Sequence, residues 1–426
     1  MNKKEAIEYI ESNTWSKTKL GLDRTRELLH LLGDSQKKLK FVHVAGTNGK
    51  GSTCAMLASI LSEAGYCCGL YTSPHIVQFN ERMQVNGINI SDDDLIALAE
   101  KVKPVVEMMK EHPSQFEIIT AMAMLYFIKK KCDIVVLEVG LGGLLDSTNV
   151  IDKPEVAVIT NIGLEHTEYL GDTLEKIASA KAGIIKQDCL TVCYRGSQTV
   201  EKVFENKCIE MNSKLIKAKF DSIKLISSSL KGQYFSYDGL DDLFIPLLGE
   251  HQLKNASVVI EAIRALRNLG WKISDEALCN GLRKTVWIVR FELVDEDPLF
   301  IIDGAHNPQC VQELANTIDK YLPKEKVTFI LGVLKDKNYL SMIRSVLPYG
   351  ENYICVTPDS SRALSNEELK NVIDSLGGKA IAVSSLKDSI KIAKELSQGK
   401  PIVAFGSLYM VGLLRQEYLK QKKTGE

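Results

Sequence analysis

The sequence lacks the features that would assign it to a specialised class of protein. Its 53 Lys and Arg balance 54 Asp and Glu, so bulk charge does not favour nucleic acid as a partner. Its ten cysteines contain no CxxC pair, which favours a reducing compartment over a disulfide scaffold. Its longest helix-like apolar run, residues 118–128, is too short to span a bilayer. We therefore expect a cytoplasmic, monomeric protein that binds neither nucleic acid nor membranes.

What the chain does contain is a series of short β-branched runs, each followed by a turn and a helical pattern. These runs cover residues 41–45, 133–139, 155–161, 299–303, 327–333, 353–357, 380–385 and 401–407. Strand–helix alternation of this kind is typical of parallel sheets covered by helices on both faces. The sequence therefore predicts an α/β fold, and its 426 residues are enough for two or three domains.

Two stretches depart from this alternation. The segment 195–248 is more polar and is punctuated by Gly and Ser, which predicts short antiparallel strands at the edge of the first domain. The acidic stretch 295–298 separates a helical region from a new strand. We place the domain boundary at this stretch, which gives a first domain of residues 1–295 and a smaller second domain of residues 296–426.

The stretch from Gly46 to Thr53, GTNGKGST, has the character of a phosphate-binding loop. It lies between the predicted strand 41–45 and a predicted helix over 53–64. Glycines allow successive backbone N–H groups to point at phosphate oxygens, and the helix N-terminus adds the positive end of its dipole. Lys50 would then reach the outer phosphates, and the hydroxyl of Ser52 or Thr53 would serve a magnesium ion.

The spacing in this loop differs from that of the common P-loop. Gly46 is followed by two residues before the Gly49–Lys50 pair, where the common pattern has four. Gly51 also separates Lys50 from the hydroxyl residue. An incidental glycine-rich turn is the alternative, and the strand and helix on either side argue against it.

Polar motifs follow four further apolar strands. They are TSPH at 72–75, Glu138 before GLGG, NIGLEHT at 161–167 and DGAHNP at 303–308. The carboxyl ends of strands are where α/β proteins bind ligands, and carboxylate and imidazole groups there can bind a divalent metal. Taken singly, Glu138 could be a cap or ion-pair residue, His166 or His306 a surface residue, and His43 a buried core histidine.

Taken together, the motifs resemble a known family. HVAGTNGKGST, YTSPH, FNERMQVNG, EVGLGG, ITNIGLEHT, AKAGIIK, HQLKNA, RFE, DGAHNP and FGSLY occur in the order found in the folylpolyglutamate synthase and dihydrofolate synthase family of the Mur ligase superfamily. The resemblance runs from about Gly21 to Tyr409. It implies a P-loop-containing parallel-sheet ATPase domain followed by a smaller Rossmann-like α/β domain, with the active site between them.

The resemblance also assigns residues. The loop and the family pattern together place ATP binding at Gly46, Thr47, Asn48, Gly49, Lys50, Gly51, Ser52, Thr53, Asn255, Arg290 and Asp303. Ser73, Glu138, His166 and Lys181 match magnesium ligands, with Lys181 carried as a carbamate. The pteroate or folate is expected near Phe116, Glu117, Leu145 and Asp146, and His306 is expected to help position glutamate. Lys50, Lys181 and His306 are the predicted catalytic residues.

The implied reaction is the ATP-dependent joining of L-glutamate to a folate, and in some members to dihydropteroate, through an acyl phosphate. ATP is the co-substrate and Mg²⁺, expected as two ions, is the cofactor. Leu144, Ala180 and Ile288–Val289 depart from the Arg, Glu and Pro-Gly that the family usually has. Those departures leave a non-catalytic ATP-binding relative as an alternative, and a Mur-type ligase with another carboxylate acceptor is a second one.

Overall fold

The structure is a computed structural model that describes residues 1–12 and 21–424. Two compact units divide the chain. The first comprises Met1–Leu225, Phe235–Ile245 and Leu253–Val286, and the second comprises Ile226–Tyr234, Pro246–Gln252 and Trp287–Glu426. The chain thus passes finally into the second unit after Val286, earlier than the boundary that we predicted from the acidic stretch.

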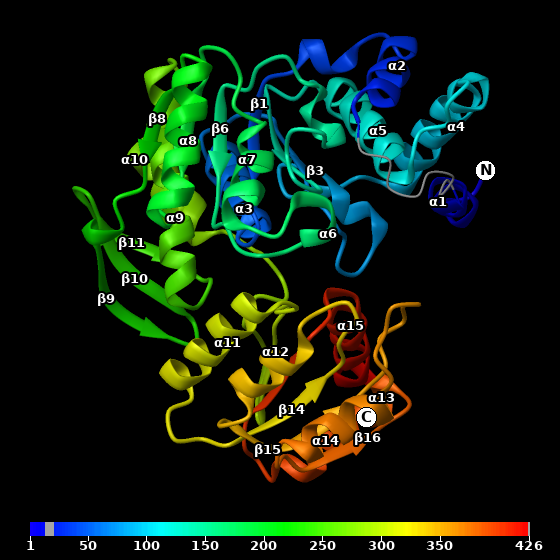
Figure 1. Ribbon diagram of the computed structural model, residues 1–426, viewed down its shortest axis with the longest axis vertical. Helices are drawn as coiled ribbons and strands as arrows, with labels where there is room; N and C mark the ends of the chain where they lie inside the picture. Colours follow the sequence, from blue (N-terminus) through cyan, green and yellow to red (C-terminus); the bar gives the residue numbers. More distant parts are fainter. Residues whose placement is uncertain (13–20, 425–426) are drawn as a thin grey trace. The chain divides into compact units, whose positions relative to one another are not determined.

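The first unit contains an eight-stranded sheet in the order β4-β3-β2-β5-β1-β6-β7-β8 (Figure 1). Its strands are β1 (Phe41–Ala45), β2 (Cys68–Tyr71), β3 (Met83–Val85), β4 (Ile88–Asn89), β5 (Ile134–Glu138), β6 (Val156–Ile159), β7 (Leu190–Cys193) and β8 (Lys214–Lys217). The six strands in the order β2-β5-β1-β6-β7-β8 pair in parallel, whereas β3 and β4 pair antiparallel at one edge. The predicted parallel sheet is confirmed, and β1, β5 and β6 are buried throughout, as strands covered on both faces should be.

Helices supply both covering layers. In the first unit they are α1 (Lys3–Ser12), α2 (Asp23–Leu31), α3 (Lys50–Glu63), α4 (Asp92–Met108), α5 (Gln115–Lys129), α6 (Thr167–Leu170), α7 (Leu174–Ala182), α8 (Gln198–Glu210), α9 (Glu250–Asn268) and α10 (Asp275–Arg283). Val42 and Val44 of β1 face a core shared with α3, α9 and α10, whereas Phe41 faces a second core shared with α1, α4 and α5. None of the helices in the described part of the chain has the length and apolar character to cross a bilayer.

The polar segment after residue 195 is only partly as predicted. Three strands, β9 (Ile223–Ser229), β10 (Gly232–Tyr237) and β11 (Leu240–Ile245), form a separate sheet. Because two-residue turns join them, they are antiparallel. Ahead of them, however, lie α8 and the parallel strand β8. The helical period was hidden because Val200, Phe204 and Cys208 are the only buried positions among the charged residues of α8.

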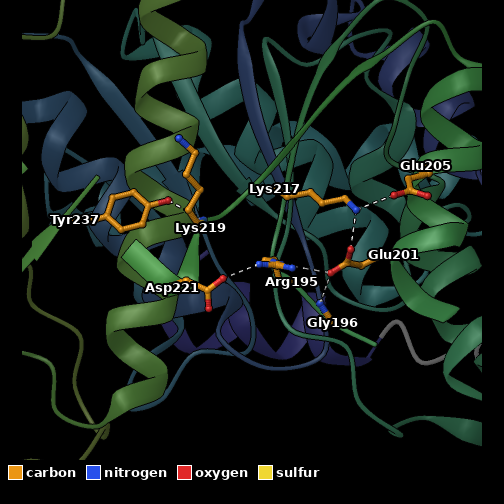
Figure 2. A network of polar contacts seen from close by, with 8 residues as sticks. All are labelled: Arg195, Gly196, Glu201, Glu205, Lys217, Lys219, Asp221 and Tyr237. Atoms are coloured by element: carbon orange, nitrogen blue, oxygen red, sulfur yellow. Dashed lines mark hydrogen bonds and ion pairs between the residues drawn. The ribbon is translucent and has the colours of Figure 1, made fainter. Parts of the chain in front are cut away.

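Charged side chains cover the edge strand β8 (Figure 2). Lys217 Nζ donates to Glu201 at 2.6 Å and to Glu205 at 2.7 Å, both on α8. Arg195 pairs with Asp221 at 3.1 Å. Exposed pairs of this kind each stabilise the fold little, but charges on an edge strand oppose pairing with another chain. We assign this network to the fold and not to a functional site.

The second unit contains a six-stranded sheet in the order β12-β13-β17-β14-β15-β16. Its strands are β12 (Glu292–Glu296), β13 (Leu299–Ile302), β14 (Val327–Leu331), β15 (Gly350–Cys355), β16 (Ala380–Ala382) and β17 (Ile402–Phe405). Its helices are α11 (Pro308–Tyr321), α12 (Tyr339–Val346), α13 (Asn366–Ser375), α14 (Leu386–Ser397) and α15 (Leu408–Thr424). Only β12 is antiparallel. The acidic stretch forms the end of β12 and the hairpin turn at 297–298 that leads into β13, which explains why it does not mark a domain boundary.

Close helix packing fixes the position of α3, the helix that follows the glycine-rich loop. Gly281 of α10 lies so near α3 that a Cβ atom there would come within 2.4 Å of Ile60 Cα. Ser59 Oγ donates to the Gly281 carbonyl at 2.7 Å. The backbone of α10 therefore sits directly on α3, and no side chain separates them.

Replacing Gly281 with alanine should lower the free energy of unfolding by about 1–2 kcal/mol. Overpacking costs about 1–3 kcal/mol, which exceeds the gain of about 0.5–1 kcal/mol from alanine in a helix. Urea unfolding measures the change. Gly196→Ala is the control, because its nearest atom would be the flexible Val200 Cγ1 at 3.3 Å. A Gly281→Ala protein as stable as the control would show that α3 and α10 separate easily.

Candidate functional site

The predicted phosphate loop connects β1 to α3 at the carboxyl edge of the sheet. Gly49 is the N-cap residue of α3 and has φ +85°, a left-handed conformation that favours glycine. The helix begins at Lys50, three residues before the predicted start. Its first N–H groups are therefore presented by the loop itself. The predicted apolar face is confirmed, since the following residues are buried: Met56, Leu57, Ile60 and Leu61.

Residues 160–163, which follow β6, hold this loop in shape. Thr160 Oγ1 donates to the Asn48 carbonyl at 2.8 Å, and Thr47 N–H donates to the Asn161 carbonyl at 2.8 Å. The Thr47 hydroxyl also donates a hydrogen bond to the Gly163 carbonyl and accepts one from the Gly163 N–H, both at 3.1 Å. Sequence reasoning missed Thr160. The signal that could have found it is a hydroxyl residue at the end of the strand predicted next to the loop.

Asn255, a predicted nucleotide contact, lies against the loop. It sits on α9 and is only 3% exposed. A Cβ atom at Gly49 would come within 2.6 Å of Asn255 Oδ1. The structure thus brings together these two residues, which are far apart in the sequence, and it leaves no room between them for a side chain.

Two lysines meet at the Gly46 carbonyl. Lys50 Nζ donates to it at 3.1 Å and to the Thr47 carbonyl at 3.2 Å, while Lys181 Nζ of α7 donates to it at 2.8 Å. Lys181 is only 4% exposed. Burial, and next the charge of Lys50, lower the pKa of Lys181 to about 7, so a large share of this amine is uncharged near neutral pH.

Two of the predicted metal ligands follow or end strands that neighbour β1. Glu138 ends β5, pairs in register with Val44 of β1 and is 4% exposed. Its Oε2 accepts the Ser73 backbone N–H at 2.9 Å. His166 follows β6, is exposed and has φ +51°. Each of these residues therefore follows a strand at the predicted edge.

The donor set fits a magnesium ion that is held mainly by substrate phosphates. No group of three His, Cys, Asp or Glu side chains within residues 1–12 and 21–424 could form a metal site by itself. Mg²⁺ usually takes one or two protein carboxylates together with phosphates and waters. The buried carboxylate of Glu138 beside the phosphate loop meets that requirement, and the ligand assignments stay predictions.

The residues predicted to bind the acceptor divide into two kinds. Phe116, at the start of α5, lies 6.1 Å from the Tyr71 ring, measured between centroids. Gly140 makes room for it, because a Cβ there would come within 2.5 Å of Phe116 Cζ. Leu145 is 45% exposed. These two side chains are placed where they could contact an apolar ligand.

The two predicted acceptor carboxylates have structural partners instead. Glu117 accepts from Arg24 at 3.1 Å and from the Ser114 N–H, as part of the capping box of α5. Asp146 is 4% exposed and accepts from Leu141 N–H at 2.7 Å and from Thr148. Burial raises the pKa of Asp146. Both carboxylates hold loops in place in this structure, and their contact with an acceptor stays a prediction.

The interpretation of His43 as a buried core histidine is confirmed. Its ring is fully buried, and its Nε2 lies 2.9 Å from Thr148 Oγ1. Burial lowers the pKa of His43 to about 3, so the ring is neutral.

In the second unit, the predicted residues gather after β13. Asp303 accepts the N–H groups of Phe291 and Ala305, both at 2.7 Å, which ties the segment before β12 to the segment after β13. Arg290 Nη1 donates to the Val289 carbonyl at 2.9 Å. His306 Nδ1 lies 2.8 Å from the Gly304 carbonyl. Arg290, Asp303 and His306 therefore lie in one group of loops.

The departure at Val289 has a structural consequence. Val289 has φ +52°, a left-handed conformation that is unfavourable for a β-branched residue. It is retained because the Val289 side chain is completely buried and its N–H donates to Glu292 at 2.9 Å. Arg415 in turn holds Glu292 through three contacts of 2.7–2.9 Å. The strained turn beside Arg290 is thus fixed from two sides.

Comparison with known proteins agrees with this architecture. The model of the Mur ligase middle domain matches residues 44–263, and that of the Mur ligase, glutamate ligase domain matches residues 289–408. The dihydrofolate synthase/folylpolyglutamate synthase of Bacillus subtilis is 37% identical over 428 residues, covering 96% of this chain and 98% of that protein. The folylpolyglutamate synthase of Lacticaseibacillus casei is 34% identical and covers 99% of this chain and 100% of its own length.

Solved structures show the same relationship. The Mycobacterium tuberculosis folylpolyglutamate synthase complexed with ADP and AMPPCP superposes with a TM-score of 0.89 at 28% identity, covering 97% of this chain and 98% of that one. The Thermotoga maritima folylpolyglutamate synthase superposes with a TM-score of 0.86 at 33% identity, covering 100% of this chain and 97% of that one.

Two parallel-sheet units, one with a phosphate loop ringed by Lys50, Lys181 and Glu138, define an ATP-dependent, ADP-forming acid–amino-acid ligase of the Mur ligase type. The similarity spans both units and nearly the whole chain. The chain belongs to the folylpolyglutamate synthase and dihydrofolate synthase family. The predicted family, fold class and enzyme class are confirmed.

Replacing Gly49 with alanine should raise the KM for ATP about tenfold or more. The new Cβ would collide with Asn255 Oδ1, and the left-handed conformation adds a cost of about 1–2 kcal/mol. Steady-state kinetics with varied ATP measures the effect. Gly65→Ala is a matched control with φ +87° and no atom within 4 Å, so it bears the same strain without the collision. An equal change of the KM in both variants would contradict the role of the Gly49–Asn255 contact.

Proposed function

We propose that the chain joins L-glutamate to a reduced folate, with dihydropteroate as a second acceptor. The observation that carries the proposal is the meeting of the phosphate loop, Lys181 and the Glu138–Ser73 pair at one sheet edge in a member of this family. The ten free cysteines support action in a reducing cytoplasm. We further propose that the enzyme works as a monomer on small molecules alone.

The chemistry requires activation of a carboxylate. An acceptor carboxylate oxygen attacks the γ-phosphorus of ATP, the bond to the bridging oxygen breaks, and ADP leaves. The amine of glutamate then attacks the carbonyl carbon of the acyl phosphate, inorganic phosphate leaves, and the amine loses a proton as the amide forms. Both steps move negative charge, so positioned cations are the main means by which the protein can accelerate them.

The residues of the loop supply this positioning. Lys50 and the N–H groups at the start of α3 would hold the phosphates, and Ser52 is buried at the same helix N-terminus. Ser73, Glu138 and His166 would hold Mg²⁺, expected as two ions, which offsets phosphate charge when bound. The second unit would contribute Arg290 and Asp303 to the nucleotide, and His306 to glutamate.

Lys181 presents a specific electrostatic problem. Two ammonium groups on one carbonyl repel each other, and Lys181 is also buried. Conversion of Lys181 to a carbamate removes this conflict, because its neutral amine adds CO₂, releases one proton and becomes an anion beside Lys50. The anion would supply oxygen ligands for Mg²⁺. The proposal rests on the burial of Lys181 and its contact with the loop.

The test of the function uses pure protein with Mg-ATP and L-glutamate, with tetrahydrofolate or dihydropteroate offered separately. We expect ADP, phosphate and a conjugate one glutamate heavier than the acceptor, with all three substrates required. Mass spectrometry identifies the conjugate and therefore the acceptor. Formation of no conjugate from either acceptor would refute the proposal, and ADP release without any acceptor would indicate a simple ATPase.

Replacing Lys181 with alanine should lower kcat at least about 100-fold, a loss typical when a group that stabilises transition-state charge is removed. Short carboxylates such as acetate should restore part of the activity, because they can occupy the place of the carbamate. Lys176→Ala is the control, since Lys176 is an exposed residue of the same helix that pairs with Asp172. Full activity of the Lys181→Ala protein would refute the carbamate.

A further inference from the structure

One buried arginine has no acidic partner. Arg82 ends the 3-10 helix Phe79–Arg82, within the FNERMQ motif, and is 8% exposed. Its Nε donates to His75 Nδ1 at 3.0 Å, and its guanidinium carbon lies 5.5 Å from the centre of the Phe79 ring. No carboxylate in the described part of the chain forms an ion pair with it. A buried charge without a counter-charge is costly, so this feature requires an explanation.

Another arginine shows how the same fold treats an equally buried guanidinium. Arg24 is also 8% exposed, and it pairs with Glu117 at 3.1 Å. His75 does not supply Arg82 with the counter-charge that Glu117 supplies to Arg24. Its Nδ1 accepts the hydrogen bond from Arg82 Nε at 3.0 Å, so this nitrogen offers a lone pair and not a negative charge. Among the residues that the structure describes, no carboxylate therefore compensates the positive charge of Arg82.

The two terminal nitrogens of Arg82 are open to a ligand. Within residues 1–12 and 21–424, only Nε has a hydrogen-bond partner. Nη1 and Nη2 do not belong to the polar atoms that are sealed from solvent without a partner, so they are accessible. Two parallel N–H groups at the end of a guanidinium match the two oxygens of a carboxylate.

The loop around Arg82 is built to hold it rigidly. The Glu81 carboxylate accepts the N–H groups of Ile76, Val77 and Gln78 at 2.7–3.2 Å. Thr72 N–H donates to the Arg82 carbonyl at 3.1 Å. These bonds close the segment from 72 to 82 on itself. Arg82 is thus fixed in the same loop as Ser73, whose backbone N–H donates a hydrogen bond to Glu138.

The surroundings of Arg82 are aromatic as well as cationic. Met83, the next residue, pairs in register with Tyr71. Burial raises the pKa of Tyr71, and the Thr120 hydrogen bond and then the charge of Arg82 oppose that rise. Tyr71 lies beside Phe116, the predicted acceptor contact. Tyr71 is fully buried, whereas Phe116 is half-buried and is the ring of this pair that a ligand could reach. A ligand with an aromatic body and a carboxylate would suit the combination of Phe116 and the Arg82 guanidinium.

We infer that Arg82 binds the carboxylate end of the acceptor and that His75 is a positioning residue, whose Nδ1 lone pair orients the guanidinium. This inference rests on the proposed function, because it assigns a residue to the acceptor of that reaction. An ATP phosphate offers similar oxygens. The acceptor is favoured because Arg82 has contacts with Phe79, His75 and the Tyr71 strand and with none of the residues 46–53.

The test measures the KM of each substrate, and the Kd of dihydropteroate in the absence of ATP, for Arg82→Lys and Arg82→Ala. Loss of charged hydrogen bonds worth about 1.5–3 kcal/mol corresponds to a rise of about 10- to 100-fold in the KM and Kd of the acceptor. The KM values for ATP and glutamate should stay unchanged. Added guanidinium ion should partly rescue Arg82→Ala, and His75→Leu should raise the acceptor KM by less than Arg82→Ala does.

Arg195→Ala is the matched control, because it removes an arginine of the same unit that pairs with Asp221. Thermal unfolding establishes that each variant is folded, and Arg82→Lys decides the question if Arg82→Ala is not. An unchanged acceptor Kd in both Arg82 variants overturns the inference, and a raised KM for ATP alone assigns Arg82 to the phosphates. If the wild type binds dihydropteroate but forms no conjugate, the proposed function fails while the Kd values still decide the role of Arg82.

Discussion

The parallel pairing of β1 with β5 on one side and β6 on the other is the constraint on which the site depends. Register places Glu138 opposite Val44, and it places the end of β6 opposite Ala45. The phosphate loop leaves the sheet from the middle strand, so its carbonyls and N–H groups are reached from both neighbours. Thr160 holds the loop from one side, and Glu138 stands at the other.

Electrostatics at this edge are organised by burial. Lys50 and Lys181 share the Gly46 carbonyl, and Arg82, in the loop 72–82, has no carboxylate partner in the described part of the chain. Positive groups held in this way cost free energy in the folded protein. They are retained where negative charge arrives with the substrates, and ATP and a carboxylate acceptor supply that charge. The arrangement therefore fits a ligase better than it fits a protein that only binds a neutral ligand.

Much of the fold followed from local sequence patterns, and the failures have definite causes. The β-branched runs gave the strands, because buried parallel strands need continuous apolar residues. Helix α8 was missed because its three buried residues are spaced among charges. Glu117 and Asp146 stay predictions as acceptor contacts. The linear motif could not show that each carboxylate also accepts hydrogen bonds within the fold, in a helix cap or from a neighbouring N–H.

The sequence by itself determined the phosphate loop, the strand ends and the family, because each depends on residue types at short, fixed spacings. The tertiary structure alone decided which of those residues meet. It set Asn255 against Gly49, hydrogen-bonded Lys181 to the Gly46 carbonyl, and gave Arg82 no acidic partner among the described residues. The physical reason is that burial and counter-charge are properties of the surroundings in space, and the residues that form those surroundings come from distant parts of the chain.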